Sequence, residues 1–203
     1  MAIKPVIRIG SEKLATPSLP VTNFTNGEIK ELINDMQDTM KDKGGIGIAA
    51  PQIDCNLRVI IFGFENSQRY PNEKPIPFTI LINPVIEMLS DETVDGWEGC
   101  LSVPGLRGLV PRYKKINYQG YDIDGNTISR TVEGFHARVV QHEYDHIDGI
   151  LFPRRIKDMK FFGFEDEMKD IIWPNPDLPT EFVKDLLISK HQDRSLAEPF
   201  DFE

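Results

Sequence analysis

An α+β fold is predicted by the order in which helical and strand-like patterns follow one another along the 203 residues. An amphipathic helix near the N-terminus precedes several β-branched and aromatic runs, and a second helix follows them. Helices and strands that are segregated along a chain, rather than alternating, are typical of α+β folds. The length fits one domain with an appendage.

The first helix is expected to begin at Thr25 and to end at Gly44 and Gly45. Thr25 and Glu28 have the spacing of a capping box, in which two side chains satisfy free backbone donors at a helix start. An apolar face then recurs at helical spacing, formed by Ile29, Leu32, Ile33, Met36 and Met40. This face is interpreted as core packing.

Strands are expected in four β-branched or aromatic runs, residues 57–64, 78–86, 115–121 and 127–132. Pro84 lies near the end of the second run, and a polar loop, residues 65–77, separates the first two. Asp124, Gly125 and Asn126 favour a hairpin turn between the last two runs. A helix over residues 136–148 follows and is expected to stop at Gly149.

The C-terminal part differs from the rest in charge and in proline content. Residues 165–203 carry 11 acidic and 4 basic side chains, whereas the preceding residues carry 21 and 19, so most of the net charge of −9 lies in this tail. We expect residues 1–172 to form one folded domain. Residues 173–203 are expected to be an acidic extension, with a possible short helix after Thr180.

Composition excludes several classes of protein. The longest apolar run, residues 58–64, is far shorter than the roughly 20 residues that a bilayer span needs. No signal-peptide pattern is seen at the N-terminus, and two cysteines cannot form a secreted disulfide framework, which favours the cytoplasm. Without a basic surface, direct binding of nucleic acid is not expected.

The strongest chemical signal is His142-Glu143-Tyr144-Asp145-His146. Histidines four residues apart lie one turn apart on a helix, so both rings can reach one metal ion. Glu143 can accept a proton from water that the metal activates. The alternative interpretation is that the two histidines lie on a solvent-exposed helix face and bind no metal.

A third ligand is needed for a tetrahedral site, and the sequence leaves several candidates open. Glu165, Glu167 and His191 lie downstream, but the better candidate is Cys100, whose thiolate suits iron or zinc. The competing interpretation of Cys100, and the preferred one for Cys55, is a small buried hydrophobe.

A third feature is the small-residue segment Gly45-Ile46-Gly47-Ile48-Ala49-Ala50-Pro51-Gln52. It lacks the lysine of a phosphate-binding loop and the third glycine of a dinucleotide site. Its glycines allow another backbone to approach closely, and the amide of Gln52 can donate to an oxygen.

Taken together, these segments resemble peptide deformylases. That family carries G-φ-G-φ-A-A-x-Q, E-G-C-φ-S and Q-H-E-φ-D-H in this order, and here they are residues 45–52, 98–102 and 141–146. The resemblance covers about residues 1–155. It implies a fold in which antiparallel β-sheets surround a central helix that carries the HExxH segment. It also implies a reaction, the removal of the N-formyl group from the initiator methionine of new polypeptides with release of formate.

The resemblance also assigns residues. It implies that Cys100, His142 and His146 bind one divalent metal, usually Fe²⁺, which Zn²⁺, Ni²⁺ or Co²⁺ can replace. Glu143 would move the proton, and the Gln52 amide and Leu101 backbone N–H would stabilise the oxyanion. The substrates would be N-formylmethionyl peptides and nascent chains. They would pair as an added strand with three residues, Ile46, Gly47 and Gly99.

Some features depart from the family pattern. Arg138 replaces a more apolar lining near the methionine pocket, and it either lies there or points to solvent. Arg107 is expected either to support Glu98, to meet the peptide or to be structural. The loop at residues 65–77 is longer than in the compact form. The acidic tail does not support docking on the ribosome.

Two other interpretations remain open from the sequence. A zincin-like metallopeptidase would take a ligand downstream of the helix and have no role for Cys100. A metal-stabilised binding module, or an inactive relative, would close the fourth coordination position. Glu143 and Gln52 argue against it, because a structural site needs neither.

Overall fold

The computed structural model describes residues 2–24, 27–67 and 70–172. Three α-helices lie in this part of the chain: α1 (Gly27–Asp42), α2 (Gly134–Ile147) and the short α3 (Lys169–Ile172). Its strands are β1 (Gly47–Ala49), β2 (Val59–Phe64), β3 (Ile76–Met88), β4 (Thr93–Cys100), β5 (Val103–Tyr113), β6 (Lys115–Tyr121), β7 (Thr127–Glu133) and β8 (Phe162–Phe164). Short 3₁₀ turns cover Glu12–Ala15, Ala50–Ile53, Phe152–Arg155 and Met159–Phe161.

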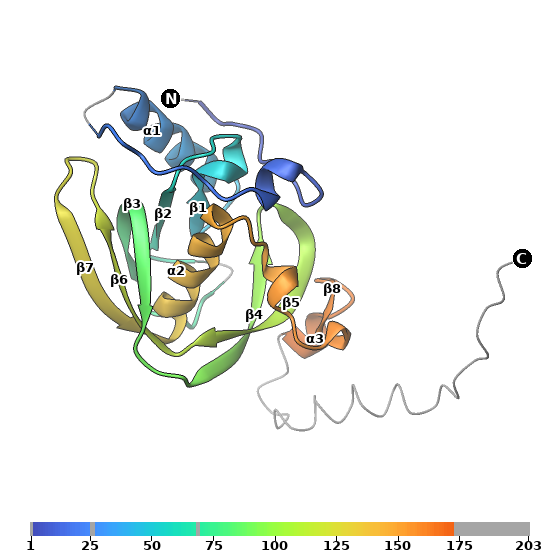
Figure 1. Ribbon diagram of the computed structural model, residues 1–203. Coiled ribbons are helices and arrows are strands. Elements are labelled where there is room, and N and C mark those ends of the chain that lie inside the picture. Colours follow the sequence, from blue (N-terminus) through green and yellow to red (C-terminus); the bar gives the residue numbers. More distant parts are fainter. Residues whose placement is uncertain (1, 25–26, 68–69, 173–203) are drawn as a thin grey trace, which may run out of the picture.

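Two antiparallel sheets enclose α2. The larger sheet has the order β1-β2-β3-β6-β7, and the smaller one has the order β4-β5-β8. Figure 1 shows α2 between them, with α1 at the β1–β2 end of the larger sheet. The α+β prediction is therefore confirmed as antiparallel sheets with a helix.

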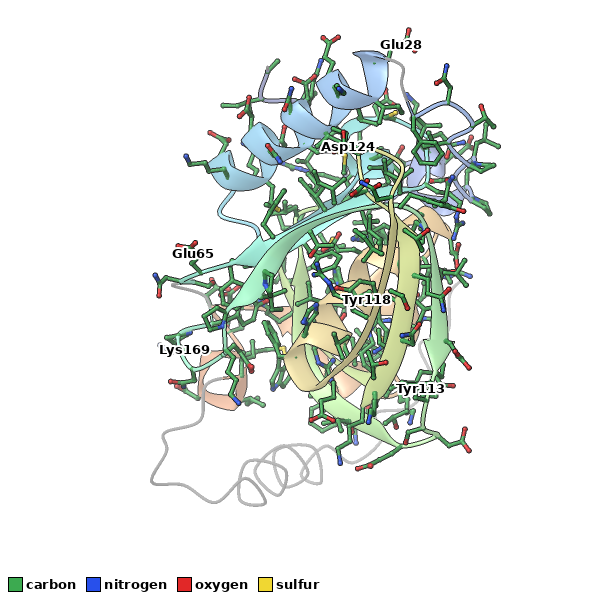
Figure 2. The ribbon with its side chains drawn as sticks, turned by 90° about the vertical axis from the view of Figure 1, so that its left-hand side faces the viewer. Glu28, Glu65, Tyr113, Tyr118, Asp124 and Lys169 are labelled. Atoms are coloured by element: carbon green, nitrogen blue, oxygen red, sulfur yellow. The ribbon has the colours of Figure 1, made fainter. Side chains whose placement is uncertain are left out.

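The helix α2 is held in place by its apolar side. Ala137, Val140 and Ile147 are completely buried, and they belong to one core cluster with Phe62 of β2 and Tyr118 of β6. Figure 2 shows Tyr118 inside the fold and Glu28 and Glu65 at its outer surface. Burying one such aliphatic side chain stabilises the fold by about 1.5–3 kcal/mol, so this contact fixes the position of the helix.

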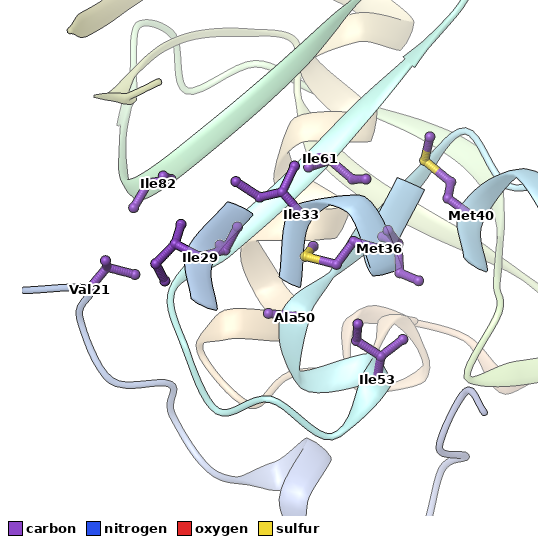
Figure 3. Packing of buried hydrophobic residues seen from close by; sticks show 11 residues of the cluster. Val21, Ile29, Ile33, Met36, Met40, Ala50, Ile53, Ile61 and Ile82 are labelled. Carbon is purple, nitrogen blue, oxygen red and sulfur yellow. The ribbon is translucent and has the colours of Figure 1, made fainter. Parts of the chain in front are cut away.

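The predicted apolar face of α1 packs against the other side of the sheet. Ile33 and Met36 are buried against Ile61 of β2 and Ala50, as Figure 3 shows. The helix ends before Gly44, whose φ of 61° is a left-handed conformation that glycine adopts easily. The expected cap, Thr25, lies outside the described residues.

The predicted hairpin is confirmed. Tyr121 pairs with Thr127, and the turn is closed by Asp122, whose Oδ1 accepts hydrogen bonds from the backbone of Asp124 and Asn126. Gly125 adopts a φ of 83° in this turn. The last strand and α2 then follow directly, as the order of the sequence patterns indicates.

All four predicted strand runs form strands, but one is longer than expected, and the short strands β1 and β8 were not predicted. The run expected at residues 78–86 forms a longer strand, Ile76–Met88, because Pro84 lies at a bulge between Ile82 and Val85 instead of ending the pairing. The strands β4 and β5 were not predicted. Their glycines and prolines hide the alternation of polar and apolar residues that marks a strand.

The predicted division at residue 172 is not tested, because the acidic extension and its possible helix after Thr180 lie beyond the described part of the chain. Within that part, no helix is both long enough and apolar enough to cross a membrane.

Candidate active site

Three side chains that can bind a metal converge between β4 and α2. The donor atoms of Cys100, His142 and His146 all lie within 4.8 Å of one another. The Sγ atom of Cys100 is 3.3 Å from Nε2 of His146, and the two histidine rings are 4.9 Å apart. All three residues are buried. Among the described residues, this is the group of Cys, His and acidic side chains that is close enough to hold an ion.

Local structure brings the three together. Cys100 ends β4, where Cys100 pairs with Val103 across the tight turn into β5. The amide of Ser102 donates to the Cys100 sulfur at 3.4 Å, which directs the thiol toward α2. His142 and His146 lie one turn apart on α2 and therefore face the same way.

A buried carboxylate orients the first histidine. Oε2 of Glu98 is 2.8 Å from Nδ1 of His142, so Nε2 is the nitrogen left to bind an ion. Burial by itself would raise the pKa of Glu98, but the charge of Arg112 and the hydrogen bond from His142 hold it well below its usual value. Arg112 donates to both Glu98 oxygens, at 2.9 and 3.0 Å. Glu98 is therefore a charged acceptor at neutral pH.

Of the three roles that the sequence left open for Arg107, support of Glu98 is not observed. Glu98 pairs with Gly108, so Arg107 is one residue out of register and its side chain lies on the opposite face of the sheet. There it donates to Glu165 at 2.9 Å and to the Tyr70 hydroxyl at 3.2 Å. Glu165, considered as a possible ligand, is thus engaged by Arg107.

Arg138 does not point to solvent. It is 9% exposed, and its guanidinium donates to Oε1 of Glu98 at 2.9 Å and to the Val110 carbonyl at 2.8 Å. Glu98 therefore lies between two arginines, Arg112 and Arg138. These ion pairs give each of the three buried charged groups an opposite charge. Burying any one of them without a partner would destabilise the fold.

Glu143 is buried beside the two histidines. Its Oε2 has no hydrogen-bond partner within the described structure. Burial raises the pKa of Glu143 to about 7, although the charge of His142 opposes the shift. A carboxyl group with such a pKa can take and return protons near neutral pH.

The backbone of Gly47 lies against this carboxylate. A Cβ at position 47 would come 2.7 Å from Cδ of Glu143, so any side chain there would displace it. The small-residue segment predicts the approach of another backbone, but the group that approaches Gly47 is the side chain of Glu143.

Gln52 has a defined orientation. Its Oε1 accepts from the Ala49 amide at 2.8 Å, which turns Nε2 toward the site. Nε2 lies 3.4 Å from the Cys100 sulfur and 3.1 Å from the Ser102 hydroxyl. A side-chain NH₂ group therefore lies next to the three donor atoms.

A cavity of about 50 Å³ opens onto these groups. The predicted substrate residues Ile46, Gly47 and Gly99 line it, as do Gln52, Leu101 and Glu143. Every residue that the sequence assigns to the site thus contributes to one cavity or to the ligand cluster behind it. His146 is the one that does not line the cavity.

Sequence reasoning missed Arg112 and Tyr70. Arg112 links the site to Asp145, to which it donates at 2.5 Å, and Asp145 also accepts from Arg155 at 2.7 Å. An arginine on a sheet gives no signal of this role, because its partners are distant in sequence. Tyr70 comes from the loop before β3 and lines the cavity.

The donor set fits a divalent metal. One thiolate sulfur and two imidazole nitrogens suit iron or zinc, and three protein ligands leave a coordination position open. Burial lowers the pKa of His146 well below its usual value. The His146 ring is therefore neutral, as a metal ligand must be.

Comparison with known proteins gives a consistent result. The family model for polypeptide deformylase matches residues 3–162. Peptide deformylase 1 of Nitrosomonas europaea is 54% identical over 166 residues, which cover 82% of this chain and 94% of that protein. Peptide deformylase 1 of Bordetella pertussis is 53% identical over 175 residues, covering 86% and 99%.

Solved structures agree. A class I type b peptide deformylase from Acinetobacter baumannii, crystallised with Met-Ala-Ser, matches with a TM-score of 0.73 at 37% identity and covers 76% of this chain and 99% of that one. The peptide deformylase of Thermotoga maritima matches with a TM-score of 0.68 at 32% identity, covering 78% and 100%. The chain belongs to the polypeptide deformylase family, whose metal-dependent members remove the N-formyl group from newly synthesised polypeptides.

Proposed function

We propose that Cys100, His142 and His146 together hold one divalent ion, Fe²⁺ in the cell, which Zn²⁺, Ni²⁺ or Co²⁺ can replace. The observation that carries the proposal is the convergence of their donor atoms within 4.8 Å, beside a cavity lined by Glu143 and Gln52. The same donor set binds several first-row metals, so metal supply selects the ion.

When bound, the ion supplies an activated water nucleophile and polarises the formyl carbonyl. Glu143 then has the role of general base and acid. Its carboxylate takes a proton from the attacking water and returns it to the amine that leaves as formate is released. The free Oε2 atom and the raised pKa of Glu143 support this assignment.

Two donors stabilise the negative charge that develops on the formyl oxygen. The first is Nε2 of Gln52, which the Ala49 amide holds in orientation through Oε1. The second is the backbone N–H of Leu101, in the turn after Cys100. Removing one donor of this kind typically lowers the rate by about 10²–10³-fold.

The peptide binds as an added strand along Ile46, Gly47 and Gly99. These residues line the cavity, and a main-chain contact of this kind tolerates many sequences. The Acinetobacter baumannii relative was crystallised with Met-Ala-Ser bound, which supports a peptide that begins with methionine as the ligand. The methionine side chain then lies deeper in the cavity, toward Val139 and Arg138.

The substrates are N-formylmethionyl nascent chains in the cytoplasm, and residues 1–172 form the catalytic domain. Direct contact with nucleic acid or membrane has no part in the proposal. The near-neutral body of the chain and the acidic residues 165–203 support this, because both nucleic acid and membrane surfaces favour basic partners.

The test is formate release from formyl-Met-Ala-Ser by protein purified without oxygen and loaded with Fe²⁺. Glu143→Gln is expected to lower kcat by at least about 10²-fold while iron content is unchanged, because the variant loses the proton acceptor and keeps the ligands. Cys100→Ala is expected to lose both iron and activity. The exposed Glu87→Gln is the matched control and is expected to match the original protein.

Full activity of Cys100→Ala would contradict the ligand assignment, and full activity of Glu143→Gln would contradict the proton-transfer assignment. Absence of formate release from the iron-loaded original protein would contradict the proposed reaction itself.

A further inference from the structure

Two neighbouring cavities in this structure share part of their lining. The active-site cavity has a volume of about 50 Å³, and its neighbour, between β4, β5 and the start of α2, has about 450 Å³. Four residues line both cavities, namely Tyr70, Trp97, Phe135 and Arg138. These four residues, here called the partition, separate a small space from a large one.

Arg138 is fixed across the space between α2 and the smaller sheet. Besides Glu98 and the Val110 carbonyl, its guanidinium donates to the Gly96 carbonyl at 3.2 Å and to the Val94 carbonyl at 2.5 Å. Position 96 has no room for a side chain, because a Cβ there would lie 2.6 Å from Cζ of Arg138. Hydrogen bonds to β4 and β5 therefore hold the Arg138 side chain in one position.

Tyr70 is held from the other side. Its ring centroid lies 4.8 Å from that of Phe135, at the start of α2, and its hydroxyl accepts a hydrogen bond from Arg107 at 3.2 Å. The partition thus has two polar anchors, Arg138 on β4 and β5 and Tyr70 on Arg107. Neither anchor is a proposed metal ligand or a proposed proton carrier.

The size of the small cavity matches a short side chain. One water-sized group occupies roughly 10–15 Å³ on the same volume measure, so about 50 Å³ has room for about three to five such groups. An unbranched side chain of methionine's length fits this space. A longer one would meet the partition.

We propose that Arg138 and Tyr70 are specificity-determining residues, which limit the length of the first side chain by closing the active-site cavity against its larger neighbour. The inference rests on the proposed function, which directs the first side chain toward Val139 and Arg138. Removing either residue of the partition would join the two cavities, and a longer first side chain could then extend into the larger one.

The test compares two formyl tripeptides that begin with norleucine or with 2-aminooctanoic acid, whose unbranched side chain is longer by two methylene groups. The measured quantity is the ratio of their kcat/KM values with the full-length, iron-loaded protein. The original protein is expected to prefer norleucine by about 100-fold or more, because one misfitting methylene costs roughly 10-fold or more. In both Arg138→Ala and Tyr70→Ala, the ratio is expected to fall to about 10-fold or less.

The fraction of active enzyme affects both kcat/KM values equally and therefore drops out of their ratio. A variant that is partly unfolded or partly metal-free would thus not give the expected change in the ratio. Tyr70→Ala also leaves the contacts of Glu98 intact, which separates pocket length from the orientation of His142. Arg130→Ala and Tyr121→Ala, both at exposed positions outside the two cavities, are the matched controls and are expected to keep the original ratio.

An unchanged ratio in both partition variants would overturn the inference, since Arg138 would then act only by supporting Glu98. Equal use of the two peptides by the original protein would overturn it as well. Absence of formate release from formyl-Met-Ala-Ser by the original protein would instead overturn the proposed function, together with the inference that rests on it.

Discussion

Oε2 of Glu98 lies 2.8 Å from Nδ1 of His142, and both groups are buried. This hydrogen bond selects the tautomer in which Nε2 of His142 carries the lone pair. The negative charge of Glu98 is in turn kept by Arg112 and Arg138. A chain of charges therefore reaches from the sheet to the proposed metal ligand.

Glu98→Gln is expected to raise the dissociation constant for Zn²⁺ by about 10–100-fold, because an amide is a weaker acceptor for the His142 N–H than a carboxylate. Competition with a chelator measures this constant. Glu87→Gln, on the exposed side of β3, is the control. Equal affinity of Glu98→Gln and the original protein would show that Glu98 does not tune the ligand.

Arg112→Met is expected to destabilise the fold by about 3–5 kcal/mol, because it leaves the buried Glu98 and Asp145 without a shared cation. Urea denaturation at one saturating Zn²⁺ concentration measures the change. Lys114→Met removes an exposed pair with Glu92, at 3.0 Å, and is expected to cost less than about 1 kcal/mol. A similar decrease in the free energy of unfolding in the two variants would contradict the claim that the buried ion pairs of Arg112 matter more than an exposed one.

Gly47→Ala is expected to lower kcat by about 10²-fold with little change in unfolding temperature, because its Cβ displaces the Glu143 carboxylate from the cavity. Steady-state formate release measures the loss. Gly27→Ala is a matched control, because among the described residues no atom outside its own helix turn and chain neighbours lies within 4 Å of a Cβ at that position. Normal kcat in Gly47→Ala would mean that Glu143 need not occupy its present position.

Asp35 connects α1 with the N-terminal segment and makes stability depend on pH. Burial would raise its pKa, but the hydrogen bonds from Lys4 and the Ala2 amide hold the pKa below its usual value. A carboxyl group whose folded pKa is lowered stabilises the fold fully above its unfolded pKa, and this contribution disappears as pH falls through the folded pKa.

Asp35→Asn is therefore expected to lower the free energy of unfolding by about 1–3 kcal/mol, and by the same amount at each pH between 5 and 8. The difference is expected to shrink below about pH 4, where the carboxyl group of the unfolded chain is already protonated. Thermal unfolding at a series of pH values measures it. A difference that grows toward low pH would contradict the assigned direction.

Much of the site could be predicted from the sequence because its chemistry is local. The i, i+4 spacing of His142 and His146 depends only on helix geometry, and the hairpin at Gly125 depends only on turn chemistry. The small residues around Gly47 indicated the close approach of another backbone, whereas the side chain of Glu143 is the group that approaches.

The rest depends on contacts between distant segments, which a pattern does not encode. Cys100 and His146 are 46 residues apart. Thiolate chemistry made Cys100 the better candidate for the third ligand, and the resemblance then assigned it. The sequence left open whether Arg107 supports Glu98, whereas the register of β4 with β5 gives that position to Arg112. The burial of Arg138 follows from the carbonyls of β4 and β5, two strands that the sequence did not predict.

The central claim is that Cys100, His142 and His146 hold the catalytic ion, and X-ray absorption by the Zn²⁺-loaded protein tests it most directly. We expect one sulfur neighbour at about 2.3 Å and nitrogen or oxygen neighbours at about 2.0–2.1 Å, with the sulfur signal lost in Cys100→Ala. A spectrum without sulfur in the original protein, or one unchanged in Cys100→Ala, would contradict the account.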